Sequence, residues 1–397
     1  MILRFANRML REPAPPILAR FLWNLGWKGG RAIRRFRRVG AAGGGFPPFL
    51  FISVTNRCNL ACQGCWVSPT EPPCDLGLDA LDRIVADSNR LGTFVFGILG
   101  GEPLLHDGLL DLFARHRDSY FILFTNGTLL TPETTAAFRR VGNVTPLVSV
   151  EGREAVSDER RGGSDVYART LRGLAACREQ RLITGVATSL CRSNLAELAA
   201  PEFIDDLVRL GVHYLWYYLY RPVGPRPCLE LALSADEILR FRRFLVDIRT
   251  RAPLLIVDSY WDAEGRPFCP SAAGLSYHIG PAGDVEPCPP IQFARDRVDG
   301  EGGVGGAVQN SEFLRRFREF AGAATRGCVL MESPEKLRDF LAKEQARDTS
   351  GRGTAMAELA AMRACPSHAA PGVEVPERTW FYRAAKRAWF FGMGTYG

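Results

Sequence analysis

The chain has 397 residues, 46% of them hydrophobic and 23% charged, which is typical of a folded globular protein with room for one large and one smaller domain. No stretch reaches the ~20 apolar residues of a membrane-spanning helix, and the opening MILRFANRML carries arginines where the apolar core of a secretory signal would lie. We therefore expect a cytoplasmic protein, in which eleven cysteines favour metal binding or redox chemistry over disulfides.

Residues 1–47 form a basic segment that is rich in apolar and aromatic side chains. Its first forty residues contain nine arginines and Lys28 against a single acid, Glu12. Such a pattern indicates either a helix that packs its apolar face on the body of the protein or a peripheral contact with an anionic membrane surface. Composition alone leaves both interpretations open.

Residues 48–250 alternate β-prone runs with amphipathic helical patterns. Six strands are predicted, at 48–55, 94–99, 120–125, 147–150, 184–190 and 214–220. Six strand–helix repeats predict parallel strands with right-handed crossovers, and hence an α/β fold with a partial parallel (β/α)6 barrel. Ligand-binding residues are then expected on the loops that follow the carboxyl ends of the strands.

Three closely spaced cysteines follow the first predicted strand. Cys58, Cys62 and Cys65 have the spacing C-x3-C-x2-C, and Cys74, nine residues further on, is expected to be a bystander. A structural zinc site uses four protein ligands, whereas a four-iron cluster held by three cysteines keeps one iron free for another ligand. The loop therefore favours an iron–sulfur cluster over part of a zinc knuckle.

This loop resembles the signature of the radical S-adenosylmethionine (SAM) superfamily. The resemblance implies a [4Fe-4S] cluster whose open iron is chelated by SAM, and reductive cleavage of SAM to a 5′-deoxyadenosyl radical that abstracts hydrogen from a substrate. It also implies a reductant such as flavodoxin or ferredoxin. One departure is Gly64, which stands where the family usually has an aromatic residue near the adenine; Trp66 is a partial substitute.

The resemblance extends to motifs after the next three strands. Gly100, Gly101 and Glu102 begin a stretch similar to the GGEP motif, which holds the methionyl amino group of SAM. Asn126 ends the third strand and Ser149 the fourth, in motifs similar to those of the peptide-modifying branch. By this resemblance all five residues are expected to contact SAM.

Two further elements complete the expected cofactor pocket. Glu151 replaces the commoner Asp of the family, and Arg161 matches the arginine that pairs with the SAM carboxylate, with Arg160 as its competitor. Thr188 and Leu190 end the fifth strand, and their position predicts that they flank the adenosine.

Residues 251–368 form a predicted smaller, cysteine-rich domain. The run from Cys269 to Cys288 resembles the opening of the auxiliary-cluster domain called SPASM, or of its shorter twitch form, and Cys328 and Cys365 follow. The resemblance implies one auxiliary [4Fe-4S] cluster held by the first three cysteines, with Cys365 as an optional fourth ligand. A zinc site with the same four cysteines is the alternative.

The sequence thus predicts a radical SAM oxidoreductase or maturase and leaves two substrate classes open. Its motifs favour a peptide or protein substrate, whereas the basic aromatic segments 1–47 and 369–397 favour a membrane lipid or isoprenoid. A non-enzymatic iron–sulfur electron carrier or a zinc-binding scaffold is the alternative from another class. No catalytic base or hydrogen donor is assigned, and no nucleic-acid module is recognisable.

Overall fold

The computed structural model describes residues 1–40, 45–67, 69–70, 72–370 and 372–390. Its centre is a nine-stranded sheet in the order β7-β6-β5-β4-β3-β2-β1-β8-β9, in which β1 to β8 are parallel to their neighbours and β9 is antiparallel to β8. The strands are β1 (Phe49–Ser53), β2 (Val95–Leu99), β3 (Tyr120–Thr125), β4 (Val144–Ser149), β5 (Gly185–Leu190), β6 (Tyr214–Leu219), β7 (Leu255–Val257), β8 (Ser276–Ile279) and β9 (Val285–Glu286). The parallel run from β1 to β6 confirms the predicted α/β fold with a partial barrel.

The sheet extends beyond the six predicted strands at both ends. β7 pairs with β6, and β8 pairs in parallel with β1 although it lies far away in the chain. A buried polar chain joins β1, β8 and β9: Ser53 Oγ lies 2.8 Å from His278 Nε2, and His278 Nδ1 lies 2.6 Å from Glu286 Oε2. The predicted cysteine-rich region, residues 251–368, therefore contributes three strands, β7, β8 and β9, to the central sheet.

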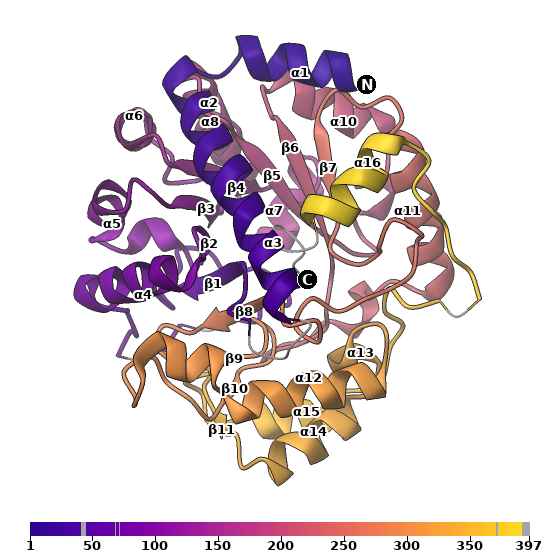
Figure 1. Ribbon diagram of the computed structural model, residues 1–397. Helices are drawn as coiled ribbons and strands as arrows, with labels where there is room; N and C mark the ends of the chain where they lie inside the picture. Colours follow the sequence, from indigo (N-terminus) through magenta and orange to yellow (C-terminus); the bar gives the residue numbers. More distant parts are fainter. Residues whose placement is uncertain (41–44, 68, 71, 371, 391–397) are drawn as a thin grey trace.

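Helices between the strands cover the outer face of the sheet (Figure 1). They are α4 (Leu78–Leu91), α5 (Leu109–Arg115), α6 (Pro132–Val141), α7 (Glu154–Arg161), α8 (Val166–Glu179), α9 (Leu195–Leu198), α10 (Pro201–Arg209) and α11 (Ala235–Ile248), with the short 3-10 turns η2 (Pro103–Leu105) and η3 (Leu229–Leu231). Alternate strand residues such as Leu50 and Ile52 point toward these helices and form the larger core. This packing fixes the carboxyl ends of the strands, from which the site is built.

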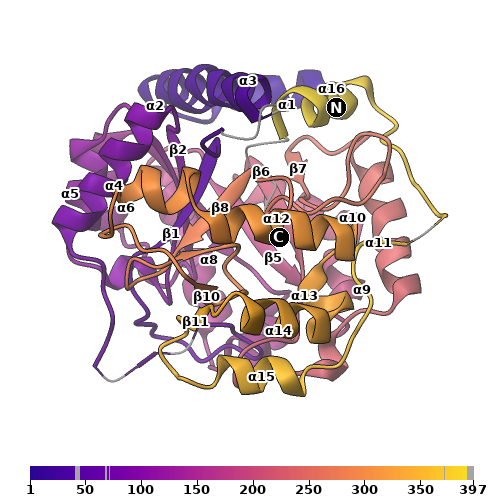
Figure 2. The same cartoon turned by 60° about the horizontal axis from the view of Figure 1, so that its bottom comes forward.

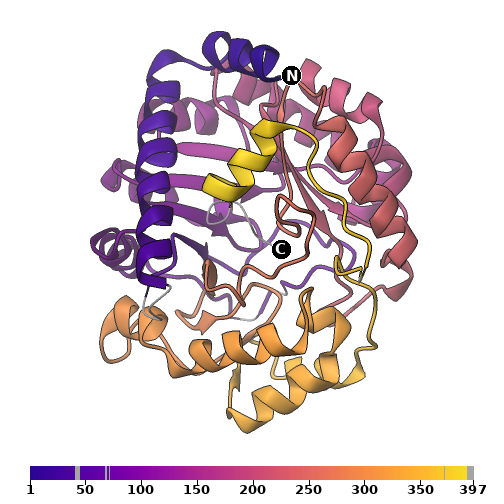
Figure 3. The same cartoon turned by 45° about the vertical axis from the view of Figure 1, so that its right-hand side comes forward.

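The N-terminal segment closes the inner face of the sheet. It folds as α1 (Ile2–Arg11), α2 (Pro15–Arg20), the π-helical η1 (Phe21–Lys28) and α3 (Gly29–Gly40). Leu25 of η1 and Ile33 of α3 are buried against Phe49, Phe51 and other inward residues of the sheet, and α3 runs across it in Figures 1 and 3. The apolar side of this segment therefore packs on the body of the protein, and none of the described helices is long and apolar enough to cross a membrane.

The C-terminal third adds a helical layer at one end of the molecule (Figure 1). Its elements are β10 (Phe293–Ala294), η4 (Gly305–Gln309), α12 (Glu312–Ala324), α13 (Val329–Glu332), α14 (Pro334–Lys343), β11 (Arg347–Asp348) and α15 (Ala355–Ala361). β10 and β11 pair as a small separate antiparallel sheet.

The tail of the chain is attached to the barrel by buried charges. After α16 (Trp380–Ala385), Lys386 begins η5 (Lys386–Phe390) and its Nζ lies 2.9 Å from Asp258 Oδ2. Arg249 lies 2.6 Å from both Asp258 and Glu377, and these charged side chains are 2% exposed or less. Because an unpaired buried charge is costly, the described part of the tail is fixed beside β7. Residues 391–397 of the predicted tail lie outside the described residues.

Candidate active site

The cysteine loop lies at the carboxyl end of β1. Cys58, Cys62 and Cys65 line one cavity of about 310 Å³; the first two are half-buried and Cys65 is exposed. Burial raises the pKa of the Cys58 thiol, so a positive charge is needed to hold its thiolate. Cys74 is not among the lining residues, and its backbone N–H donates to Asn56 Oδ1.

The loop after β2 packs closely against the cysteine loop because it contains two glycines. A Cβ atom at Gly101 would lie 2.2 Å from the backbone oxygen of Arg57 and 2.8 Å from Cys58 Cβ, and one at Gly100 would lie 2.7 Å from the backbone oxygen of Thr55. Gly101 also donates its backbone N–H to Thr55 O. Both glycines line the cavity. Because they have no side chain, the loop after β2 can pack directly against the backbone of the cysteine loop and so fixes its position.

Glu102 points its carboxylate into the protein. The side chain is fully buried and accepts hydrogen bonds from Thr125 Oγ1 and from the backbone N–H groups of Asn126 and Leu104. Burial raises the pKa of Glu102, while these hydrogen bonds oppose the shift. The carboxylate therefore fixes the end of β3, and the neighbouring Asn126 reaches the cavity wall.

The end of β5 contributes a different pair of residues from the predicted one. Thr188 is buried, and Leu190 belongs to the outer core; neither is among the residues that line the cavities around the cysteine loop. Ala187 and Ser189 take the inward positions beside Ser149, because successive residues of a strand face opposite sides of the sheet. Of the predicted contacts, Ser149 lies at the cavity and the β5 pair does not.

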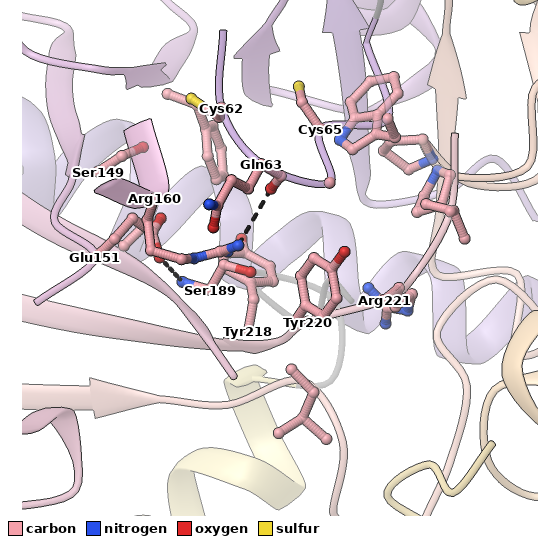
Figure 4. A pocket seen from close by; sticks show the side chains of 18 of the residues that line it. Cys62, Gln63, Cys65, Ser149, Glu151, Arg160, Ser189, Tyr218, Tyr220 and Arg221 are labelled. Atoms are coloured by element: carbon pink, nitrogen blue, oxygen red, sulfur yellow. Dashed lines mark hydrogen bonds between the residues drawn. The ribbon is translucent and has the colours of Figure 1, made fainter. Parts of the chain in front are cut away.

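Arg161 connects the cysteine loop with the acid after β4. Its Nη1 lies 3.5 Å from Cys62 Sγ, and its Nη2 lies 3.7 Å from Glu151 Oε1. Glu151 also accepts a hydrogen bond from the backbone N–H of Ser189 (Figure 4). Arg161 Nη2 has no hydrogen-bond partner among the described atoms, so a buried donor remains available at the cavity.

Tyr220 occupies the space beside Gly64. Gly64 has φ +64°, and a Cβ atom there would lie 2.0 Å from the Tyr220 hydroxyl. The Tyr220 ring lies under the guanidinium of Arg160, at 5.1 Å from its centre, and Arg160 donates to the backbone oxygen of Gln63 (Figure 4). A ring from the end of β6 thus fills the space in which a side chain at position 64 would lie.

The comparisons with known proteins identify the family. The profile of the radical SAM superfamily matches residues 52–215. The GTP 3′,8-cyclase of Synechococcus sp. is 35% identical over 341 residues, which cover 78% of this chain and 88% of that protein. The chain belongs to the radical SAM superfamily.

Further similar proteins have lower sequence identity to this chain. The PqqA peptide cyclase of Streptomyces rochei is 27% identical over 62% of this chain and 70% of its own length. The Fe-coproporphyrin III synthase of Methanosarcina barkeri is 27% identical over 54% of this chain, which spans only 56% of that relative. The crystal structure of Streptococcus suis SuiB bound to precursor peptide SuiA shares the fold, with TM-score 0.60 and 16% identity over 73% of this chain and 71% of that one.

Radical SAM enzymes use a [4Fe-4S] cluster and SAM, and the residues at this cavity fit both. Three thiol side chains line it, and Arg161 adds a cation with a free buried donor. Within the described ranges, no three His, Cys, Asp or Glu side chains are drawn together closely enough to hold a metal ion as they stand. The cysteines are therefore a candidate ligand set by position.

Three cysteines of the C-terminal region, Cys269, Cys288 and Cys365, lie near the fourth, Cys328. Burial raises the pKa of Cys269, Cys288 and Cys365, and the nearby Cys328 raises each of them further. Arg221, two residues after β6, donates a hydrogen bond to Cys328 and also lines the cavity beside Cys65 (Figure 4). The fold thus places Cys269, Cys288 and Cys365 near Cys328, although among the described residues these thiols are not close enough together to hold a metal as they stand. Arg221 lies beside both Cys328 and the cavity of the first cysteine loop.

Sequence reasoning did not assign Arg221 or Tyr220 to the site. Both lie at the carboxyl end of β6, where ligand contacts are expected in a parallel barrel. Their position was therefore a usable signal, but an aromatic run is more often part of a core.

Proposed function

We propose that this chain cleaves SAM reductively at a [4Fe-4S] cluster held by Cys58, Cys62 and Cys65. The cluster and SAM together supply a radical that abstracts hydrogen from a substrate. The observation that carries the proposal is a single cavity lined by the three cysteines, by Gly100 and Gly101 and by the polar residues Asn126, Ser149 and Arg161.

The side chains around the cavity bind and orient SAM. Arg161 offers its guanidinium to the carboxylate of SAM, and Glu151, 3.7 Å from Arg161 Nη2, holds this guanidinium at the cavity. Gly101 and Asn126 contribute small and polar surface close to Cys58. Phe124 and Tyr218 line the wall and exclude water from the reacting atoms. A flavodoxin or ferredoxin is the proposed electron donor.

We further propose an auxiliary [4Fe-4S] cluster held by Cys269, Cys288, Cys328 and Cys365. Its support is the nearness of Cys328 to each of the other three thiols and the hydrogen bond from Arg221 to Cys328. Iron and sulfide per chain test the ligand set. Cys328→Ser is expected to lose about one cluster's iron and sulfide, and zinc bound without sulfide would contradict the proposal.

A peptide or protein is the proposed substrate class. The chain resembles a peptide cyclase and shares its fold with SuiB, which has been crystallised with its precursor peptide. The cavity beside Cys65 is bounded by barrel residues and by Pro289 and Pro290 of the C-terminal region, so an entering chain would touch both parts. A membrane lipid or isoprenoid is the second candidate, which is favoured by exposed aromatic and basic side chains on the N-terminal helices.

The decisive experiment uses the full chain, reconstituted anaerobically with iron and sulfide. With SAM and dithionite, the wild type is expected to release 5′-deoxyadenosine, and Cys62→Ala is expected to release none. Cys74→Ala is the matched control and should retain the activity, because Cys74 is not among the residues that line the cavity. A reconstituted wild type that binds a fully ligated cluster or zinc and leaves SAM intact would instead identify an electron carrier or scaffold. Mass spectrometry of peptides and lipids from cells with and without Cys62→Ala then identifies the substrate class.

A further inference from the structure

The N-terminal helices have an outer side that differs from their buried side. α1, α2 and α3 lie with α16 in a row along one face of the molecule (Figure 2). Leu25 and Ile33 are buried beneath this face. In the same helices, Trp23 and Leu22 of η1 are each 56% exposed, and Trp380 of α16 is 71% exposed. Large apolar side chains that gather on one exposed face mark an interaction site.

Two of the exposed side chains are paired indoles. The rings of Trp23 and Trp27 are stacked, with centroids 6.5 Å apart, although Trp27 is 51% exposed. Indole rings have an apolar body and one polar N–H group, which suits the boundary between water and lipid. A pair held in this way on a rigid helix needs no rearrangement to enter such a boundary.

At Trp27 lies an open groove of about 470 Å³, and four of its six lining residues are arginines. Its residues are Trp27, Arg31, Arg34, Arg35, Arg38 and Val39. The Arg34 guanidinium lies over the Trp27 ring, at 5.8 Å from its centre. Within residues 1–40, the basic side chains with an ionic partner in the described parts of the chain are Arg8 and Lys28. The groove arginines therefore present uncompensated positive charge to their surroundings.

We propose that this face docks on an anionic phospholipid bilayer, with lipid phosphates in the arginine groove and the side chains of Leu22, Trp23 and Trp27 in the interfacial layer. Guanidinium groups pair with phosphate oxygens through two parallel hydrogen bonds, and a basic cluster is attracted to an anionic leaflet. Stable peripheral binding requires an apolar signal together with a basic one, and this face carries both.

Two other occupants fit the observations less well. A second copy of this chain would bring the same arginines against one another, and like charges across an interface repel. A nucleic acid would pair with the arginines but would leave Leu22 and Trp380 exposed to water. The combination of charge and aliphatic surface therefore selects the bilayer, which is independent of the chemistry at the cysteine cavity.

The test is co-sedimentation of the full chain with vesicles at about 0.15 M salt. The wild type is expected to bind vesicles of equal phosphatidylcholine and phosphatidylglycerol, and to bind pure phosphatidylcholine vesicles weakly. Arg31→Gln/Arg34→Gln/Arg38→Gln is expected to weaken binding to the anionic vesicles roughly 10- to 100-fold. Trp23→Ser/Trp27→Ser keeps the charge and should also weaken binding, with the larger relative loss at high salt, where the apolar contact dominates.

The matched control is Arg83→Gln/Arg240→Gln/Arg243→Gln, which removes the same charge from exposed positions on α4 and α11. It should bind as the wild type does. Equal losses in both triple variants, unchanged binding in the groove variant, or tighter binding to transfer RNA than to vesicles would overturn the proposal. Release of 5′-deoxyadenosine without vesicles should be the same in all these variants, so that a failure of docking is distinct from a failure of the proposed chemistry.

Discussion

Replacing Gly64 by alanine tests whether Tyr220 occupies the aromatic position of the cysteine loop. Alanine at φ +64° costs about 1–2 kcal/mol in backbone conformation. The Tyr220 ring must also move, because its hydroxyl lies 2.0 Å from the new Cβ atom. That movement weakens the hydrogen bond from Cys228 N–H, worth about 0.5–1.5 kcal/mol, and the ring contact with Arg160, worth about 0.5–1 kcal/mol.

The sum is roughly 2–4.5 kcal/mol, which corresponds to a fall in Tm of about 2–5 °C for a chain of this size. The assay combines thermal unfolding of the cluster-free protein with the iron content after anaerobic reconstitution, since the displaced ring pushes on the loop between Cys62 and Cys65. Gly353→Ala is the matched control: it has φ +73° and open space, so it should show the conformational cost alone.

A double-mutant cycle separates the two contributions. In a Tyr220→Ala background the clash is absent, and Gly64→Ala should then lower the Tm only as much as Gly353→Ala does. If Gly64→Ala lowers the Tm equally in both backgrounds, or leaves Tm and iron content unchanged, then the Tyr220 ring does not occupy the space beside Gly64.

Two further predictions concern pH and SAM binding. Burial lowers the pKa of His213 to about 4 and that of His368 to about 3, so between these values and about 6.5 the unfolded chain binds protons that the folded chain does not. The free energy of unfolding should therefore decrease as pH falls from 6.5 to 4, by at most ~3 kcal/mol for His213 alone. The His213→Gln variant should show a smaller decrease over this range. A decrease equal to that of the wild type would contradict the assignment to His213. Arg161→Gln should weaken SAM binding to the cluster-loaded protein about 10- to 100-fold in calorimetry, with Arg161→Lys intermediate, and unchanged affinity in both would remove Arg161 from the site.

The sequence was most informative for features that depend on residues close together in the chain. The spacing of Cys58, Cys62 and Cys65 requires only a short loop, and the alternation of strands and helices sets the parallel sheet, so the superfamily and the fold were predictable. Thr188 and Leu190 show the limit of positional reasoning, because a shift of one residue along a strand reverses the face. The fit between Tyr220 and Gly64 depends on two segments more than 150 residues apart, which no local pattern encodes.

The N-terminal segment shows a second limit. The composition of residues 1–47 allowed two alternative interpretations, which were packing on the protein body and contact with a membrane. The helices separate them by face: Leu25 and Ile33 are buried, while Trp23 and Trp27 are exposed. Only the three-dimensional course of η1 and α3 shows which of these side chains are buried and which are exposed.

The closure of the inner sheet face by η1 and α3 has a thermodynamic consequence. Phe51 belongs to the inner core beneath Leu25 and Ile33, and the same side chain forms part of the wall beside Cys62 and Cys65. Any tilt of these two helices must repack Phe51, since protein interiors have little spare volume. By linkage, an event that stabilises one helix position outside the barrel changes the affinity for a ligand inside it only to the extent that the ligand binds one packing of Phe51 more tightly.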